Sequence, residues 1–384
     1  MVELADLKET FKKLEDKKRI IWGTGSSGKD ILNFVFPLGI SYFVDNNSSR
    51  WDQTVFDDFR CYSPDTLLAE NPDHIAIIVA SEFYTEINRQ LTDMGFCENV
   101  HYFNGLNILR PLVGKFVPGH FHSPIPSLPD ILSRKSQIFQ SEPPLGIPLY
   151  ENEQVELFTA LKTYWNQTPF PAQKSEDHRY YYDNHFFQFW DANVMHSMIR
   201  HLKPGKIVEV GCGYSSAAIL DTTEKHFGGS IDCTFIEPYP DRFLSLIKLT
   251  NDYKLIPSIV QEVPLHLFEE LSEHEILSFD TSHISKIGSD VNHFIFEILP
   301  RLQKGVVVHI HDVLYPFEYP ISWIQDYTYW NEAYLLRAFL QNNACYKIKL
   351  WPDYLSIRLP ELFDNGTPQG LGNYKGSLWI EKIA

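Results

Sequence analysis

Two short clusters of histidine and acidic residues follow strand candidates in the C-terminal half of the chain. The first is FDTSH, with Asp280 and His283, and the second is HIHD, with His309, His311 and Asp312. Because the carboxyl ends of neighbouring parallel strands meet at one edge of a sheet, we expect the clusters to converge there. A positioned imidazole can take a proton from a hydroxyl, and imidazole with carboxylates can hold a divalent cation. The clusters therefore predict a proton-transfer site that a metal could share.

A glycine turn precedes these clusters along the chain. It occupies residues 209–216, EVGCGYSS, where a buried strand candidate passes into a helix. Gly211 and Gly213 let the backbone turn sharply and approach a ligand closely. One strand later, Glu237 stands at a carboxyl end, where a carboxylate can accept both hydrogen bonds of a ribose diol. The turn and the acid together predict a nucleotide-like ligand at these strand ends.

With this turn and acid, residues 178–384 resemble the class I S-adenosylmethionine-dependent methyltransferases. In that family the turn meets the methionine part of the cofactor, the acid after the second strand holds the ribose, and residues after the third strand flank the adenine. The turn is G-x-G without a third glycine, which fits this family better than a dinucleotide fingerprint. The resemblance implies S-adenosylmethionine as cofactor, bound by Glu209, Gly211, Gly213, Tyr214, Ser215, Glu237, Gln261, Glu262 and Asp280.

The histidine and acidic clusters resemble those of the metal-dependent sugar O-methyltransferases that act on macrolide and aminocoumarin antibiotics. Those enzymes hold a divalent cation with a D-x-x-H after the fourth strand and an acidic pair after the fifth. Here His311 stands where an acid is usual, and imidazole suits Mn²⁺, Fe²⁺ or Zn²⁺ better than Mg²⁺. We expect His283 as base, with Asp280 and His311 as further catalytic groups. Asp280, His311 and Asp312 are the expected ligands of a Mg²⁺ or Mn²⁺ ion, a metal-free site remains an alternative, and His309 is expected to be packed inside.

Aromatic residues are dense on both sides of the predicted site, in residues 178–192 and 315–330. Aromatic faces stack on sugar rings and on flat polycyclic acceptors, and such segments commonly form substrate lids. The substrate-side candidates are Tyr181, Asp183, Asn184, Glu318 and Trp330. Ordinary core packing is an equally good interpretation of Phe186, Phe187, Phe189 and Trp190. Glu332 stands at a predicted helix start, where a first-turn acid without a role in binding is an equally good interpretation.

A second glycine motif lies near the start of the chain. Gly23, Gly25 and Gly28 have the GxGxxG spacing between a strand candidate and a helix, and Asp45 is the acid that follows the next strand. This pattern suits a nucleotide or a sugar nucleotide, whose diphosphate would face the helix N-terminus. The segment resembles the small Rossmann-like domains attached to bacterial sugar-modifying acetyl- and methyltransferases. A degenerate structural or dimerisation domain is the alternative.

Strand candidates with helical stretches between most of them recur along both halves of the chain. They include IIWGTG, ISYFVDN and IAIIVAS, and then residues 206–211, 232–237, 257–262, 275–280, 305–312, 345–351 and 377–383. Such alternation predicts doubly wound, mainly parallel sheets, and the last two candidates, with no helix expected between them, predict a closing hairpin. We expect an α/β protein of two Rossmann-like domains, the second with the seven-stranded sheet of a class I methyltransferase.

Prolines are frequent between Pro111 and Pro148 and interrupt any helical or strand period there. This change of composition marks a domain boundary. We therefore expect a small Rossmann-like domain at 1–115, a Pro-rich linker and substrate-side segment at 116–177, and the methyltransferase domain at 178–384.

Charge and composition narrow the partners. The 384 residues include 33 Lys and Arg against 49 Asp and Glu, a formal charge of −16, so neither nucleic acid nor an anionic membrane surface is an expected partner. The charged start lacks the apolar core of a signal peptide, and no apolar run is long enough to span a membrane, which predicts a soluble, cytoplasmic protein. The five cysteines have no CxxC spacing and are expected to be reduced, mostly packed thiols.

Together these features predict methyl transfer from S-adenosylmethionine to a hydroxyl of a sugar or secondary-metabolite acceptor. N-methylation of an amino sugar is an alternative within the same fold. A sugar-nucleotide or NAD-dependent enzyme that uses the GTGSSG domain is a second alternative, and a non-catalytic ligand-binding module is a third. A homo-oligomer is compatible with the sequence.

Overall fold

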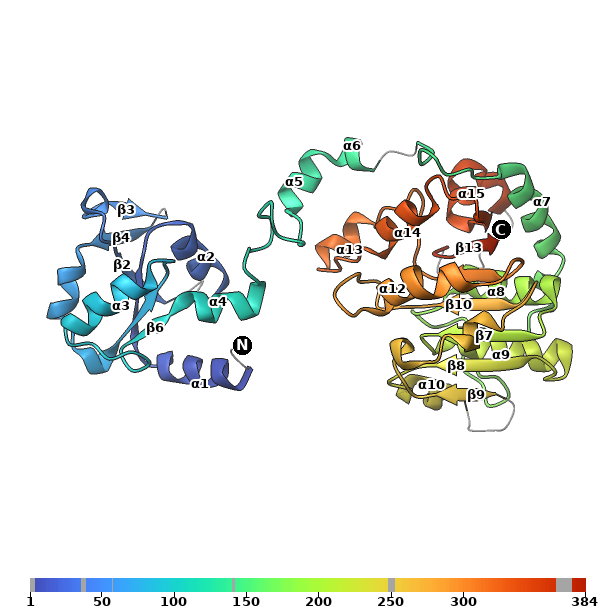
Figure 1. Cartoon of the computed structure of the whole chain (residues 1–384), viewed down its shortest axis with the longest axis horizontal. Coiled ribbons are helices and arrows are strands. Elements are labelled where there is room, and N and C mark those ends of the chain that lie inside the picture. The colour runs from blue at the N-terminus through green and yellow to red at the C-terminus, as the bar shows by residue number, and fades with distance from the viewer. Residues whose placement is uncertain (1–3, 36–38, 57, 140–141, 248–252, 364–374) are drawn as a thin grey trace. The chain divides into compact units, whose positions relative to one another are not determined.

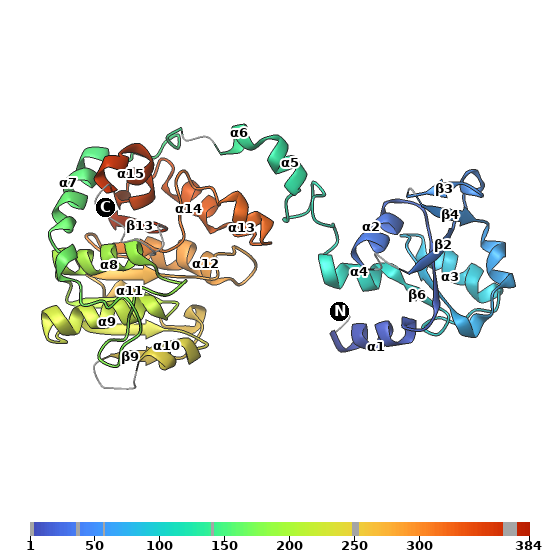
Figure 2. The same cartoon turned by 180° about the vertical axis from the view of Figure 1, so that it is seen from behind.

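The computed structural model describes residues 4–35, 39–56, 58–139, 142–247, 253–363 and 375–384. Contacts within the chain divide it into two units, Met1–Arg134 and Lys135–Ala384. In each unit strands and helices alternate, and helices cover both faces of a central sheet (Figures 1 and 2). The predicted α/β class with two doubly wound sheets is therefore confirmed.

The first unit is built on a six-stranded sheet of order β3-β4-β2-β1-β5-β6. All neighbours run parallel except β3 and β4. Its elements are α1 (Leu4–Leu14), β1 (Lys18–Trp22), α2 (Ser26–Phe34), β2 (Ile40–Val44), β3 (Thr54–Val55), β4 (Phe59–Tyr62), β5 (Ile75–Val79), α3 (Tyr84–Asp93), β6 (Tyr102–Asn104), α4 (Gly105–Val113) and α5 (Leu128–Ser133). The strand β5 is buried along its whole length, as a central parallel strand covered on both faces must be.

Gly23 and Gly25, between β1 and α2, and Gly28, inside α2, are required by the fold to different degrees. Gly23 has φ +119°, and a Cβ there would lie 2.7 Å from the carbonyl oxygen of Ala80. A Cβ on Gly28 would overlap the carbonyl oxygen of Gly23. Gly25, with φ −81°, has nothing within 4 Å of the place a Cβ would take. Packing therefore accounts for the first and third glycines, whereas the second only leaves open space in front of α2.

The second unit contains a seven-stranded sheet of order β12-β13-β11-β10-β7-β8-β9. Its strands are β7 (Lys206–Val210), β8 (Asp232–Ile236), β9 (Lys254–Ile256), β10 (Ile276–Phe279), β11 (Val307–Ile310), β12 (Tyr346–Leu350) and β13 (Leu378–Lys382). Its helices are α6 (Lys135–Ile138), α7 (Glu151–Lys162), α8 (Phe189–Leu202), α9 (Tyr214–Phe227), α10 (Asp241–Leu246), α11 (His266–Glu269), α12 (Asp290–His293), α13 (Ile321–Gln325), α14 (Glu332–Leu340) and α15 (Pro352–Arg358). Only the last strand, β13, runs antiparallel to both of its neighbours among the described residues.

Two sequence expectations about strands need correction. The third strand is Lys254–Ile256, not 257–262, because Pro257 has no N–H to donate to the ladder and the chain then forms a 3-10 turn at Val260–Glu262. The last two strands do pair antiparallel, but the helix α15 lies between them along the chain. Proline is favoured at the first position of a helix, so Pro352 marks a helix start that the sequence analysis overlooked.

Part of the segment predicted as a linker, 116–177, belongs to the second unit. The helix α7 packs against α8, α15 and β12. The Gln154 side chain on α7 accepts a hydrogen bond of 2.7 Å from the backbone N–H of Trp351. The contact boundary at Arg134 accordingly lies inside the Pro-rich stretch.

The five cysteines are free thiols, of which Cys61 and Cys233 are buried. Cys97 and Cys345 are exposed, so fewer of them pack inside than expected. In the described part of the chain, no helix is long and apolar enough to cross a membrane.

The difference between Gly28 and Gly25 can be tested by stability. Gly28→Ala places a Cβ against backbone on the other side of a tight turn, so we expect a loss of about 2 kcal/mol or more in unfolding free energy. Gly25→Ala is the matched control and should change little. Amide hydrogen exchange of β1 and β5 in the full chain should accelerate in Gly28→Ala alone; equal exchange in both variants would contradict this account.

Candidate functional site

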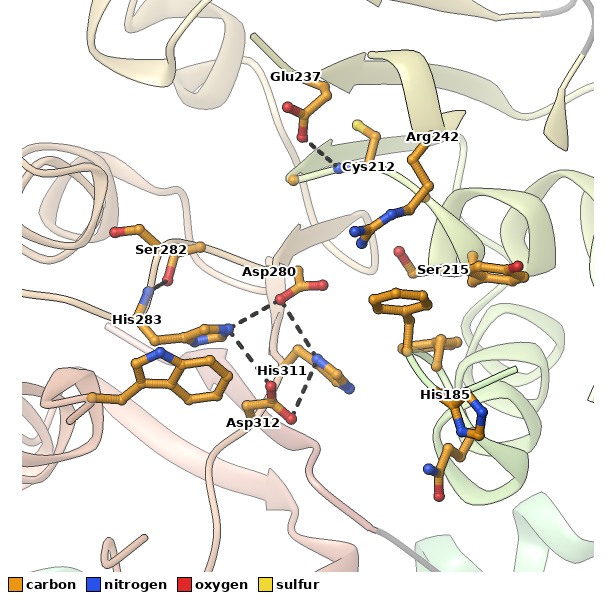
Figure 3. A pocket seen from close by; sticks show the side chains of 18 of the residues that line it. His185, Cys212, Ser215, Glu237, Arg242, Asp280, Ser282, His283, His311 and Asp312 are labelled. Atoms are coloured by element: carbon orange, nitrogen blue, oxygen red, sulfur yellow. Dashed lines mark hydrogen bonds and ion pairs between the residues drawn. The ribbon is translucent and has the colours of Figure 1, made fainter. Parts of the chain in front are cut away.

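A cavity of about 640 Å³ lies at the carboxyl ends of β7, β8, β10 and β11 (Figure 3). It joins the glycine turn, the acid after β8 and both histidine and acidic clusters, which are far apart in the sequence. Its lining residues are His185, Phe186, Phe187, Gln188, Gly211, Cys212, Gly213, Tyr214, Ser215, Glu237, Arg242, Asp280, Thr281, Ser282, His283, His311, Asp312, Trp323 and Trp330. The convergence predicted for parallel strand ends is thus present in the structure.

The turn after β7 is held tightly against β10. Gly211 has φ +82°, and a Cβ there would overlap the carbonyl oxygen of Asp280. The Asp280 amide donates to the carbonyl of Val210 at 2.9 Å, and the Gly211 amide donates to Ile236 at 3.0 Å. Glycine is therefore required at 211 by the packing of the sheet itself, in addition to any ligand.

Glu209 lies beneath the turn and does not line the cavity. It is fully buried and accepts a hydrogen bond from the Ser216 hydroxyl. Burial raises the pKa of this carboxyl to about 8, against the lowering effect of that hydrogen bond. Glu209 therefore supports the turn from inside, and a direct cofactor contact for it stays a prediction.

Glu237 faces the cavity from the end of β8. Its Oε2 accepts a hydrogen bond of 3.1 Å from the Cys212 amide, and its Oε1 accepts one of 2.8 Å from the Tyr239 amide. These two bonds fix the carboxylate beside the glycine turn, and each oxygen keeps a second lone pair. The geometry suits the acceptance of hydrogen bonds from a diol.

Gln261 and Glu262 do not reach the cavity. Gln261 Nε2 donates to the carbonyl of Gly288 at 2.8 Å, and Glu262 accepts from the Ser258 hydroxyl at 3.2 Å. They were assigned to the end of a third strand that in fact stops at Ile256. The structure therefore does not bring these two residues together with the rest of the predicted cofactor set.

His283 is held among three carboxylates. Its Nδ1 lies 2.8 Å from Glu332 Oε2, and its Nε2 lies 3.2 Å from Asp280 Oδ1 and 3.6 Å from Asp312 Oδ2. Burial alone would lower the pKa of this imidazole, but Asp280 and Glu332 raise it to about 10. His283 and Asp312 both have positive φ, of 57° and 58°, a conformation that side-chain-bearing residues adopt at a cost and that clusters at functional sites.

His311 lies on the other side of the same carboxylates (Figure 3). Its Nδ1 is 3.5 Å from Asp280 Oδ1 and 3.5 Å from Asp312 Oδ1, and neither ring nitrogen has a hydrogen-bond partner. Two donor atoms on one cation, each roughly 2.1 Å away, are about 3 to 3.5 Å apart. Asp280, His311 and Asp312 thus fit a divalent cation, with one imidazole and two carboxylate donors.

The charges of the cluster influence one another strongly. Burial would raise the pKa of Asp280, but His311 and His283 together hold it well below its usual range. Burial would lower the pKa of His311, yet Asp312 and Asp280 raise it well above its usual range. Burial raises the pKa of Asp312. Negative charge is therefore concentrated on Asp280, between the two imidazoles.

His309 is packed inside, as expected. Its Nδ1 lies 2.8 Å from the Ser278 hydroxyl, and the ring centroid lies 4.6 Å from that of Trp379. Burial lowers the pKa of this histidine to about 3. It does not line the cavity.

Of the five substrate-side candidates, Trp330 lines the cavity, and its ring lies 4.0 Å from that of His283. The other four stand outside the lining. Asn184 accepts from the amides of Phe186 and Phe187, so it fixes its own loop. The hydroxyl of Tyr181 bonds that of Tyr214, Glu318 accepts from Tyr334, and Asp183 is absent from the lining.

Several lining residues were not identified from the sequence. Arg242 reaches the cavity with its guanidinium 3.9 Å from the centroid of the Phe186 ring, and it offers a cation to an anionic group. It stands five positions after Glu237, close enough to that acid to have been considered. His185 and Trp323 belong to the aromatic segments, but nothing in their spacing separates them from their neighbours.

The first unit has a pocket of its own, of about 440 Å³, in front of α2. Gly23, Gly25 and Asp45 line it, together with Glu82 and Glu86, whereas Gly28 does not. Asp45 already accepts hydrogen bonds from the Thr24 amide and hydroxyl and from the Asn47 amide. That this pocket takes a nucleotide stays a prediction.

Comparison with known families decides the class of the second unit. Residues 208–313, which carry the glycine turn, Glu237 and both clusters, match the family model described as a methyltransferase domain. The second unit therefore contains a methyltransferase domain. Residues 15–100, inside the first unit, match the model described as C2185-like, N-terminal. An uncharacterized protein of Archaeoglobus fulgidus is 33% identical over 180 residues, which cover 45% of this chain and 81% of that protein.

The methyltransferase is also similar to solved structures. A methyltransferase from Podospora anserina, bound to S-adenosylhomocysteine, is 14% identical with a TM-score of 0.33, over 71% of this chain and 100% of that one. The O-methyltransferase TomG from Streptomyces achromogenes, bound to S-adenosylmethionine, is 11% identical with a TM-score of 0.32, over 66% and 96%. The assignment rests on the family model together with the sheet and its cavity, not on these low scores.

Cofactor binding by the methyltransferase should depend on Glu237 and not on Glu262. Glu237→Ala removes a charged acceptor at the glycine turn, so we expect about a 10- to 100-fold loss of S-adenosylhomocysteine affinity. Glu262→Ala, an acid of the same type outside the cavity, is the matched control and should bind as the wild type does. Isothermal titration calorimetry measures both, and equal losses in the two variants would contradict the placement of the cofactor in this cavity.

Proposed function

We propose that the methyltransferase acts on a hydroxyl group of a sugar or secondary-metabolite acceptor, with His283 as the base. The observation that carries this proposal is the pairing of His283, which lines the cavity, with the buried Glu332 behind it. A hydroxyl is a poor nucleophile until its proton is removed, and an imidazole oriented by a carboxylate is the common means of removing it. An amine acceptor would have less need of such a base.

Glu332 is the positioning residue for His283. It is 1% exposed, and its Oε2 lies 2.8 Å from His283 Nδ1, while its Oε1 accepts from the Thr281 hydroxyl at 3.0 Å. A carboxylate on Nδ1 keeps the proton on that nitrogen and directs Nε2 to the cavity. Trp330 covers one face of the ring. Nε2 is therefore the atom that would take the proton of the acceptor.

The base must first be free of its own proton. With Asp280 and Glu332 on its two nitrogens, the raised pKa keeps His283 protonated at neutral pH. A cation on Asp280, His311 and Asp312 would balance the charge of Asp280 and so weaken the hold of that carboxylate on Nε2. When bound, S-adenosylmethionine supplies an electrophilic methyl group, and Mg²⁺ or Mn²⁺ lowers the pKa of a hydroxyl that it contacts.

The acceptor side of the cavity supports a ring-shaped substrate. Trp323 and Trp330 lie with ring centroids 5.0 Å apart at a steep angle, and the exposed Phe186 stands under Arg242. Such aromatic faces pack well against the apolar face of a sugar or against a flat polycycle. The small-molecule acceptor class rests on this chemistry.

For the first unit we propose ligand binding without chemistry. The open space at Gly25, which packing does not explain, is the observation that favours a ligand there. Asp45, Glu82 and Glu86 would accept hydrogen bonds from hydroxyl groups but would repel a diphosphate. Of the predicted ligands, the ribose or sugar portion of a nucleotide or sugar nucleotide fits these acids best.

The acceptor class can be tested with the full chain. Release of S-adenosylhomocysteine is measured with glycosides and polycyclic alcohols or phenols, each paired with its amine analogue. We expect turnover of a hydroxyl acceptor and little or none of its amine analogue. Methylation of the amines alone would contradict the assignment of a hydroxyl acceptor. Hydride transfer to NAD would favour the alternative of an NAD-dependent enzyme.

If His283 is the base, its removal should lower the reaction rate without weakening cofactor binding. His283→Ala should lower kcat by about 10²- to 10⁴-fold, the usual range for general acid–base catalysis, and leave S-adenosylhomocysteine affinity nearly unchanged. Glu318→Ala is the control, because Glu318 lies in the neighbouring aromatic segment but not in the cavity lining. Full activity of His283→Ala would remove the base from the mechanism.

A further inference from the structure

We propose that Asp191 acts through His311 to make this site selective for a transition-metal ion, with Mn²⁺ bound in preference to Mg²⁺. The inference rests on the cation of the proposed function and assigns a role to a residue outside both clusters. Asp191 is a positioning residue, because it touches His311 and not the reacting atoms. The interaction places a carboxylate behind the imidazole ligand.

The two nitrogens of His311 face different partners. Nδ1 is 3.5 Å from Asp280 Oδ1 and from Asp312 Oδ1, on the side of the cavity. Nε2 is 3.6 Å from Asp191 Oδ2, on the buried side. A histidine that binds a metal through one nitrogen commonly directs the N–H of the other to a carboxylate, which fixes the ring and increases its basicity. Asp191 stands on the Nε2 side of His311, where such a carboxylate would lie, although at 3.6 Å the two atoms are not yet within hydrogen-bond distance.

Buried polar atoms without hydrogen-bond partners support the binding of a metal ion at this cluster. His311 and Asp191 are 3% and 2% exposed, and both ring nitrogens of His311 and Asp191 Oδ2 lack hydrogen-bond partners. Each such atom costs about 1 to 3 kcal/mol when it stays unsatisfied. A cation on Nδ1 satisfies the first atom and commits the ring proton to Nε2, where Asp191 can accept it. The cluster is thus completed by a metal.

The surroundings of Asp191 hold its carboxylate in place. Asp191 stands in the first turn of α8, a helix of 14 residues, where the helix dipole favours negative charge. Its Oδ1 accepts a hydrogen bond of 2.7 Å from the hydroxyl of Ser377, the residue before β13. With Oδ1 committed, Oδ2 is directed at His311. An ordinary capping role is not observed, since no side-chain cap is formed at Gln188.

The donor set determines the preferred ion. Mg²⁺ strongly prefers oxygen donors in an octahedral arrangement, whereas imidazole nitrogen binds Mn²⁺, Fe²⁺ or Co²⁺ more favourably. In this cluster His311 supplies one nitrogen donor, and Asp280 and Asp312 supply one oxygen donor each. By increasing the basicity of that nitrogen, Asp191 strengthens the preference. Exchange of His311 for a carboxylate would remove it.

The test is direct metal binding to the full chain, without S-adenosylmethionine or acceptor. Calorimetry with Mn²⁺ and Mg²⁺ should give at least about tenfold tighter binding of Mn²⁺ to the wild type. Asp191→Asn should lower Mn²⁺ affinity by about 10- to 100-fold, the usual effect of removing such a carboxylate, and Ser377→Ala should lower it less. His311→Asp should bring the two affinities together.

Asp221→Asn is the matched control, because Asp221 is a buried acid of the same unit whose carboxylate accepts from the Arg179 and Tyr180 amides, away from the cluster. It should leave Mn²⁺ affinity unchanged, and thermal unfolding of the metal-free variants identifies any that are misfolded. Electron spin-echo spectra of bound Mn²⁺ should contain nitrogen modulation that is absent in His311→Asp.

Three results would overturn the inference: no Mn²⁺ binding by the wild type, Mg²⁺ bound as tightly as Mn²⁺, or equal Mn²⁺ affinity in Asp191→Asn and Asp221→Asn. Metal binding that follows the expected order without any hydroxyl methylation would leave this inference standing and remove the proposed function. Hydroxyl methylation by a wild type that binds no Mn²⁺ would overturn this inference and leave the proposed function standing.

Discussion

The contact between Gly211 and the backbone of Asp280 ties the two halves of the site together. Gly211 belongs to the turn after β7, and Asp280 follows β10, the neighbouring strand. Because Gly211 has no Cβ, the turn lies directly against the Asp280 carbonyl. The Cys212 amide can then bond Glu237 on one side, while the Asp280 carboxylate projects into the same cavity on the other. A side chain at 211 would separate Glu237 from the histidine and acidic cluster.

Within that cavity, charge links the base to the cation site. Asp191, Asp280, Asp312 and Glu332 surround the imidazoles of His283 and His311. Two imidazole protons carry the same charge as one divalent cation. A cation can therefore replace both protons without a change in the total charge of the cluster, and its binding should release protons from these histidines. The doubly protonated cluster and a metal-bound one carry the same total charge, but only the second would leave His283 free to act as the proposed base.

The sequence predicted what depends on strand ends and missed what depends on how helices dock. Asp280, His283, His311 and Asp312 follow two strands, and parallel topology brings such positions together whatever their side chains are. Glu332 and Asp191 lie in the first turns of helices, 49 positions from His283 and over a hundred from His311, and no local pattern reports where those helices pack. The third strand was misplaced because its apolar run continues through Pro257, which ends the ladder.

The glycines of the two turns differ in whether packing within the fold requires them or only a ligand would. Gly23, Gly28 and Gly211 each face a carbonyl oxygen at a distance that excludes a Cβ, so folding alone would retain them. Gly25 meets nothing, and its φ is open to any residue. A GxGxxG spacing is therefore partly a packing signature and does not by itself indicate a dinucleotide. What argues for a ligand in the first unit is the single glycine that the fold does not need, and its acidic surroundings favour hydroxyl groups over phosphates.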